Sequence, residues 1–207
     1  MNAIAKISAA LAGSTGVAVG GVFVHKLVHK DVKTNTISKN IKFEYLLTKD
    51  QTEKWNHRVN LLKSAGENSL SSDLLSRKKE KSNFSSEDLK KWCSESLESE
   101  FMGVEDKKFQ NVKLYCGINI GDRINGTKVS SNTQDGNEGL KTKFSSLKGK
   151  EQGQLVKELF SIKDTANAES TWSGNKALKE WCLKALDTAF EEGLIYDNAK
   201  DYCVITG

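Results

Sequence analysis

The chain lacks the short motifs that mark common catalytic and metal-binding sites. It has no phosphate-binding loop, no G-x-S-x-G and no H-E-x-x-H, so the sequence predicts no site of these types. Structural zinc sites usually bring ligands in close pairs such as C-x-x-C, and the four cysteines include no such pair. We therefore predict no catalytic residue, no metal ligand, no cofactor and no small-molecule substrate.

Histidine is also scarce, which argues against a cysteine nucleophile. Such a nucleophile needs a neighbouring base that generates the thiolate, and the chain has three histidines. His25 and His29 lie in the N-terminal stretch, so His57 is the one candidate base. We favour an exposed helix position for His57, and we expect a protein that is not an enzyme.

What the chain does contain is a repeated segment that accounts for all four cysteines. LKKWC at residues 89–93 recurs as LKEWC at residues 178–182, and a Tyr-Cys pair follows each copy, at 115–116 and 202–203. Such self-similarity predicts a duplicated supersecondary unit.

The repeat also extends upstream of the Trp-Cys segments. Residues 47–63 match residues 147–163 at an offset of 100, which falls to 89 at the Trp-Cys segments. The first copy would then hold about eleven extra residues. We place them in a surface loop at residues 76–83.

Hydrophobic periodicity predicts a mainly α-helical fold. Trp55, Val59 and Leu62 recur at i, i+4 and i+7, which lines one face of a helix. The Trp-Cys segment forms a second amphipathic helix in each copy. The sequence therefore predicts an N-terminal hydrophobic segment followed by two tandem, related small helical modules, each closed by a disulfide.

The sequence gives clear signals for some helix ends and weaker ones for the segments that follow the Trp-Cys helices. Ser85 and Asp88 are suited to capping the start of the first Trp-Cys helix, and Gly193 is the expected C-cap of the second. Residues 112–120 alternate like a strand, whereas residues 196–203 fit either pattern. We leave this segment of each copy as a short helix or an extended arm.

The cysteine spacing favours disulfides within each copy. Modules of roughly 60 to 75 residues have thin cores, and closing a loop of 21 to 23 residues contributes about 3 kcal/mol. We therefore pair Cys93 with Cys116 and Cys182 with Cys203 as structural disulfides. Pairing between the copies, or four buried thiols in a reducing compartment, are the alternatives.

Composition divides the chain into five segments. Residues 7–24 carry no charge and reach the minimum length of a membrane span, so residues 1–24 are predicted to be a transmembrane anchor or a secretory signal. Residues 25–42, with five lysines and one aspartate, read as a basic juxtamembrane linker beside anionic lipid. The remaining segments are module one, a Gly/Asn/Ser-rich linker and module two, at residues 43–118, 119–143 and 144–207.

Charge bears on both orientation and partners. The lysines of residues 25–42 favour a cytoplasmic location for the modules, whereas the cysteines favour the outside; we side with the cysteines. We therefore expect modules outside the cell membrane or secreted. Apart from Lys6 and residues 25–42, the chain carries a net charge of about −1, so we expect no nucleic-acid partner.

The layout resembles large paralogous families of membrane and surface proteins from haemotropic mycoplasmas. The shared features are a Gly/Ala-rich hydrophobic start without a lipobox cysteine, no proline, 28 lysines against 3 arginines, and repeated Trp-Cys segments. The resemblance implies display at the single membrane of a wall-less bacterium, and host contact or antigenic diversity. It carries over no catalytic residue.

These observations converge on a surface-exposed interaction protein or antigen that contacts a host or surface protein, with residues 7–24 in the membrane. One alternative is an inward-facing membrane scaffold with reduced cysteines. A less favoured alternative is a thiol oxidoreductase with one exposed, reactive cysteine.

Overall fold

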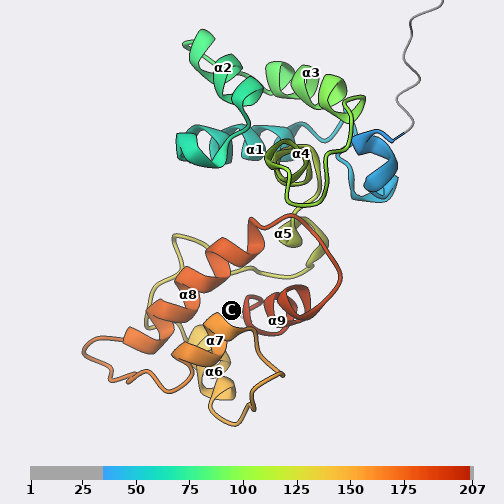
Figure 1. The fold of residues 1–207 in the computed structure, drawn as a ribbon. Helices are drawn as coiled ribbons and strands as arrows, with labels where there is room; N and C mark the ends of the chain where they lie inside the picture. Colours follow the sequence, from blue (N-terminus) through green and yellow to red (C-terminus); the bar gives the residue numbers. More distant parts are fainter. Residues whose placement is uncertain (1–34, 206–207) are drawn as a thin grey trace, which may run out of the picture. The chain divides into compact units, whose positions relative to one another are not determined.

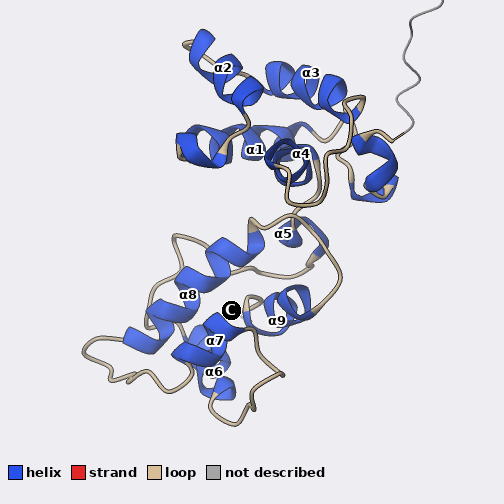
Figure 2. Ribbon diagram, in the orientation of Figure 1, coloured by secondary structure: helices blue, strands red, loops and turns tan. Residues whose placement is uncertain are grey.

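Helices form the regular structure of the chain, as the sequence predicts, in a computed structural model that describes residues 35–205 (Figure 2). The predicted anchor or signal at 1–24 lies outside the described residues, as does most of the predicted linker at 25–42. No helix within residues 35–205 has the length and apolar character needed to cross a membrane.

We call residues 35–117 the first half and residues 118–205 the second half (Figure 1). The first half contains three short 3-10 helices and four α-helices: η1 (Ile37–Asn40), η2 (Phe43–Tyr45), α1 (Thr52–Ser64), η3 (Glu67–Ser69), α2 (Ser72–Glu80), α3 (Ser86–Leu97) and α4 (Lys107–Cys116). The second half contains five α-helices: α5 (Ile120–Arg123), α6 (Glu138–Leu147), α7 (Lys157–Ile162), α8 (Ser173–Leu186) and α9 (Leu194–Tyr202).

Helix α3 begins at the capping box that the sequence predicts. The Ser85 hydroxyl accepts from the Asp88 backbone N–H at 3.3 Å, and the Ser85 N–H donates to the Asp88 carboxylate at 3.0 Å. Lys81 and Ser85, which also hydrogen-bond this carboxylate, lower the pKa of Asp88 to about 2. From this start, α3 turns Leu89, Trp92 and Cys93 into the core.

For residues 112–120 the sequence leaves a short helix or an extended arm open, and the structure has the helix, because α4 runs through Cys116. Asp106 caps this helix by accepting from the Phe109 N–H at 3.0 Å. Phe109, Val112 and Cys116 are buried at helical spacing, whereas the alternating position Leu114 is only half-buried. The apolar residues of a segment this short fit the spacing of a strand as well as that of a helix. The cap at Asp106 is the signal that favours the helix.

Gly193 does not end the second Trp-Cys helix, contrary to the prediction. Helix α8 ends at Leu186, and Gly193 is instead the N-cap of α9, with φ of 138°. Glycine reaches this φ without a steric penalty. The glycine between α8 and α9 thus lies at the start of α9 and not at the end of α8.

The surface loop predicted at residues 76–83 is largely helical. Helix α2 continues to Glu80, and its basic side chains are engaged rather than free. Arg77 pairs with Glu95 of α3, and Lys79 pairs with Glu67 at 2.7 Å. A run of charged residues next to a turn suggests a loop, but these residues form the outer face of a helix.

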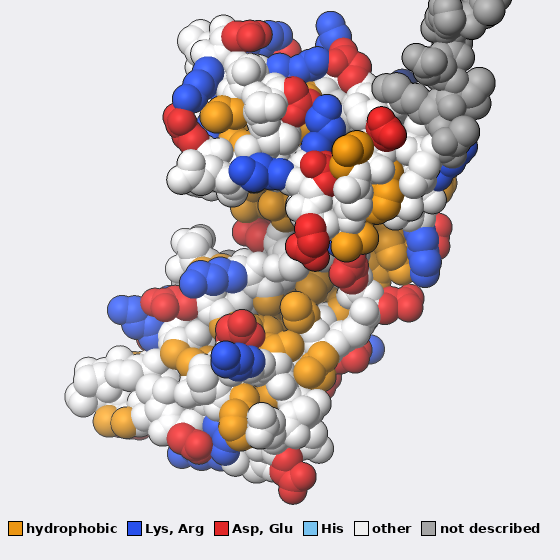
Figure 3. Space-filling view, in the orientation of Figure 1, with side chains coloured by type: hydrophobic (Ala, Val, Ile, Leu, Met, Phe, Trp, Pro, Cys, Tyr) orange, Lys and Arg blue, Asp and Glu red, His pale blue; other side chains and the backbone are white. Residues whose placement is uncertain are grey.

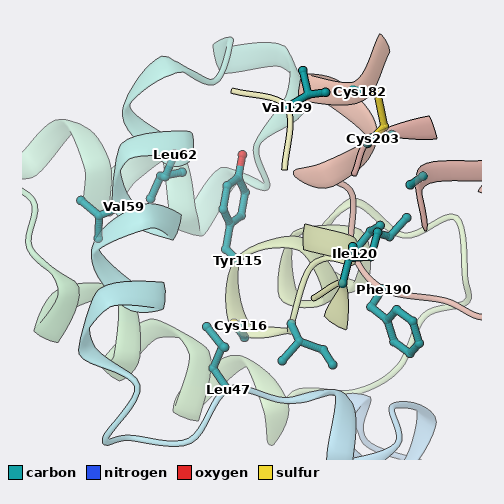
Figure 4. Close-up of a cluster of buried hydrophobic side chains, with 14 of the residues drawn as sticks. Leu47, Val59, Leu62, Tyr115, Cys116, Ile120, Val129, Cys182, Phe190 and Cys203 are labelled. Atoms are coloured by element: carbon teal, nitrogen blue, oxygen red, sulfur yellow. A yellow bond between two sulfur atoms is a disulfide. The ribbon is translucent and has the colours of Figure 1, made fainter. Parts of the chain in front are cut away.

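The Gly/Asn/Ser-rich stretch 119–143 does contain turns, but it also contains α5 and the start of α6. Three of its apolar side chains, Ile120, Ile124 and Val129, are buried. Figure 4 shows Ile120 near Phe190, and Val129 near the disulfide of Cys182. This stretch is thus fixed to the core at several points.

Short antiparallel pairings fix the segments that follow the two Tyr-Cys pairs. Residues 116–118 pair with residues 45–47, and residues 203–205 pair with residues 127–129, each through two backbone hydrogen bonds of 2.8 to 2.9 Å. Residues 118–120 also pair with residues 188–190 of the second half. The chain between 116 and 120 therefore contacts both halves.

We expect Ser85→Ala to lower the free energy of unfolding by about 1 kcal/mol, because the first turn of α3 loses its cap. Equilibrium urea unfolding measures the change. Ser94→Ala is the matched control, since Ser94 is exposed in the same helix; equal losses in both variants would contradict a capping role.

Candidate functional site

The structure brings together the two predicted cysteine pairs. Cys93 of α3 bonds Cys116 of α4, and Cys182 of α8 bonds Cys203, which follows α9. The Cα–Cα distances are 5.6 Å and 5.3 Å, within the usual range for disulfides. Each disulfide thus joins the Trp-Cys helix of a half to the last helix of that half.

The chemistry available to these cysteines is limited by their burial. All four are at most 3% exposed, and none is free. A reactive thiol needs access to solvent and a stabilised thiolate, so this arrangement weighs against the oxidoreductase alternative. Within residues 35–205, no cluster of three or more His, Cys, Asp or Glu side chains is placed to hold a metal ion.

Next to the first disulfide, Asn111 forms a clamp that sequence reasoning missed. Its side chain on α4 is 5% exposed. The amide oxygen accepts from the Ser71 N–H at 2.7 Å, and the amide nitrogen donates to the Ser69 carbonyl at 3.0 Å. One side chain therefore satisfies two backbone groups and ties α4 to the start of α2.

Asn198 forms the same kind of clamp in the second half. Its amide oxygen accepts from the Val156 N–H at 2.8 Å, and its amide nitrogen donates to the Gln154 carbonyl at 3.0 Å. Each asparagine precedes the second cysteine of its half by five residues, in NVKLYC at 111–116 and NAKDYC at 198–203. Extending the Tyr-Cys match four residues upstream would have found both.

A buried ion pair links the halves. Arg58 of α1 is fully buried, and its guanidinium donates to the Gly117 carbonyl at 3.2 Å and pairs with Asp122 of α5. Burial lowers the pKa of Arg58, although the Asp122 carboxylate acts against this shift. Asp122 also accepts from the Asn119 N–H at 2.8 Å, so the pair fixes the chain where it passes between the halves.

His57 occupies an exposed position on α1, as predicted, but it has a partner. Its Nε2 lies 2.7 Å from a carboxylate oxygen of Asp187, at the C-cap of α8, and half of its side chain is exposed. This contact joins α1 to a carboxylate of the second half, and no cysteine of residues 35–205 is free to act with His57 as a nucleophile.

An apolar cavity of about 220 Å³ lies where the two halves meet. Tyr45, Phe109 and Phe190 line it, and the ring of Phe190 packs edge-on against Tyr45 with centroids 5.0 Å apart. Lys113 and Glu191, which form an ion pair, also line the cavity. Sites for drug-sized ligands usually exceed about 300 Å³, so this cavity lies below the usual range for such ligands.

Among residues 35–205, the three most exposed large apolar side chains belong to the first half. Phe43 is 82% exposed, Met102 is 71% exposed and Val104 is 58% exposed. Met102 and Val104 follow Phe101, whose N–H donates to the Asn35 carbonyl, so their loop begins beside the first described residue. On the face drawn in Figure 3, Lys and Arg side chains lie among Asp and Glu rather than in one large basic area.

Comparison with known proteins gives no further assignment for this site. The chain matches no protein-family model, no curated protein and no solved structure.

A half-buried carboxylate of the first half joins three helices. Asp73 of α2 accepts from the Trp92 indole N–H at 2.9 Å and from the Lys108 ammonium at 3.0 Å. Burial acts to raise the pKa of Asp73, but hydrogen bonds with Ser71, Trp92 and Lys108, together with the Lys108 charge, outweigh it and lower the pKa.

We expect Asp73→Asn to make stability less dependent on pH. Because folding lowers the pKa of Asp73, its contribution is present above the unfolded pKa of about 3.9 and is lost as the pH falls through the folded pKa. Urea unfolding at neutral and acidic pH measures this contribution. Asp164→Asn is the control, since Asp164 is largely exposed; the same pH dependence in the wild type and in Asp73→Asn would contradict the assignment.

We expect Asn111→Ala to lower the free energy of unfolding by about 1 to 3 kcal/mol, because it leaves a buried backbone N–H without an acceptor. Asn198→Ala should cost a similar amount. The control Asn132→Ala, at an exposed position with no side-chain hydrogen bond in the described structure, should be near neutral. Thermal and urea unfolding give the values, and a neutral Asn111→Ala would show that the clamp does not stabilise the fold.

Proposed function

We propose that this protein is a non-enzymatic interaction protein, built from two copies of one disulfide-closed helical module and displayed outside a cell membrane or secreted. The observation that carries the proposal is the pair of buried disulfides, each joining the last helix of a half to its Trp-Cys helix. Disulfides of this kind persist in oxidising surroundings, which favours export.

The duplicated-module proposal rests on contacts that recur in both halves. The disulfide, the asparagine clamp and the pairing after the second cysteine have counterparts in each half. On this basis α1, α2, α3 and α4 correspond to α6, α7, α8 and α9. We propose copies at residues 35–117 and 118–205, in place of modules at 43–118 and 144–207 separated by a linker.

This correspondence implies a different alignment upstream of the Trp-Cys segments. An offset of 85 residues matches one set of buried side chains with another, namely Trp55, Val59 and Leu62 with Leu140, Phe144 and Leu147. The same offset matches Leu70 and Leu74 with Leu155 and Leu159. An offset of 100 instead matches α1 with residues 152–164, of which only the six residues of α7 are helical. We therefore propose the offset of 85.

The proposed partner is a host or surface protein, in keeping with the resemblance to mycoplasma surface families. The first half carries three strongly exposed apolar side chains, Phe43, Met102 and Val104, which a protein partner would cover. The nearly neutral surface charge supports a protein partner over a nucleic acid. We place the membrane contact at residues 7–24.

The inward-facing scaffold is the second candidate, because the lysines of residues 25–42 favour a cytoplasmic orientation. It requires four reduced cysteines in the cell. The closely apposed cysteine pairs support the outward orientation over this one.

We expect a non-reducing peptide map of the native protein to contain two linked peptide pairs, Cys93 with Cys116 and Cys182 with Cys203. Intact cells are first treated with an alkylating agent, so that disulfides cannot form during lysis. Each bond contributes about 3 kcal/mol by the chain-entropy estimate, so reduction should also lower the thermal midpoint of the purified chain.

Two further results separate the alternatives. Protease added outside intact cells should digest residues 35–205. If these residues are protected and all four cysteines are alkylated, the inward scaffold is supported and the proposal is refuted. A double variant, Cys182→Ala with Cys203→Ala, should leave the Cys93–Cys116 bond intact; free thiols at Cys93 and Cys116 in that variant would argue against two separately closed copies.

A further inference from the structure

A covalent modification site lies between α5 and α6. Asn125 and Gly126 are the one Asn-Gly dipeptide in the sequence, and both residues are exposed. Buried Ile124 and Val129 anchor the chain on either side. The dipeptide therefore forms an exposed turn between fixed points.

The fold requires glycine at position 126. Its φ is 100°, a conformation that side chains with a Cβ rarely adopt. A Cβ at this position would also lie 2.8 Å from a methyl group of Val204. The backbone nitrogen that follows Asn125 therefore belongs to glycine, the residue without a side chain that could block its approach to Asn125. The fold disfavours replacement of this glycine by another residue.

Neither reacting group at this turn is held by a hydrogen bond. Within residues 35–205, the Asn125 side-chain amide and the Gly126 N–H have no hydrogen-bond partner. The side-chain amides of Asn111 and Asn198, in contrast, are buried and each held by two hydrogen bonds. Asn125 is thus free to turn its side chain toward the next residue.

We propose that Asn125 deamidates spontaneously in the folded protein. The Gly126 backbone nitrogen attacks Cγ of Asn125, a new C–N bond closes a succinimide ring, and the side-chain nitrogen leaves as ammonia with the proton lost by Gly126. Water then opens the ring at either carbonyl, which yields aspartate or isoaspartate. Water is the one co-reactant, and no atom is oxidised or reduced. Asparagine is among the thermally labile residues of proteins.

The isoaspartate product changes the backbone beside a structural contact. It adds one carbon atom to the main chain at residue 125, directly before Gly126. The next residue, Thr127, has a carbonyl that accepts from the Ile205 N–H at 2.9 Å. This bond is part of the pairing of residues 127–129 with 203–205, next to the Cys182–Cys203 disulfide. Deamidation therefore weakens this pairing and adds a negative charge, while the disulfide still holds Cys203.

The test incubates the oxidised full chain at physiological temperature and mildly alkaline pH, in water enriched in oxygen-18. Peptide mapping should show loss of an amide nitrogen and uptake of the heavy oxygen at Asn125 ahead of every other asparagine. Asn125→Gln is the matched variant, because a glutamine would have to close a larger ring, and its map should stay unchanged over the same period.

Either of two results would overturn the proposal: retention of the Asn125 amide for as long as that of Asn132, or deamidation in a free peptide of residues 120–130 but not in the folded chain. Hydrogen exchange separates the structural consequence from the chemistry. The isoaspartate form should exchange faster at Ile205 than the unmodified chain, and equal rates would refute weakening of the pairing.

Discussion

The attachment of the last helix of each half to its Trp-Cys helix is the constraint on which the rest of the described structure depends. Helices α4 and α9 are short, ten and nine residues, and helices of that length are marginal in water on their own. Each is held by a disulfide at its C-terminal end and by an asparagine clamp one turn earlier. Covalent and hydrogen-bonded attachment thus replaces the large apolar face that a longer helix would bury.

The sequence predicts the features that depend on residues close together in the chain. Ser85 and Asp88 identify the start of α3 because a capping box is a local hydrogen-bond pattern. The spacing of Trp55, Val59 and Leu62 identifies the buried face of α1. The cysteine pairs could also be predicted, because each pair closes a loop of 21 to 23 residues within one small module with a thin core.

The features that the sequence does not predict depend on contacts between distant residues. Arg58 and Asp122 are 64 positions apart, and nothing in either neighbourhood signals a buried ion pair. Asn111 is a different case, because it belongs to a repeated motif that extends further than the Tyr-Cys pair, yet its hydrogen-bond partners lie some 40 residues away. Residues 112–120 are a third case, since their alternation leaves a short helix and an extended arm open until Asp106 is recognised as a helix cap.

The central position of residues 116–120 has a consequence for cooperativity. Residues 116–118 pair with residues 45–47, and residues 118–120 pair with residues 188–190. Arg58 also binds the carbonyl of Gly117. Separation of the halves would break hydrogen bonds in both, so neither half loses its order without a cost to the other. The described part of the chain should therefore melt as one thermodynamic unit, although each half has a disulfide of its own.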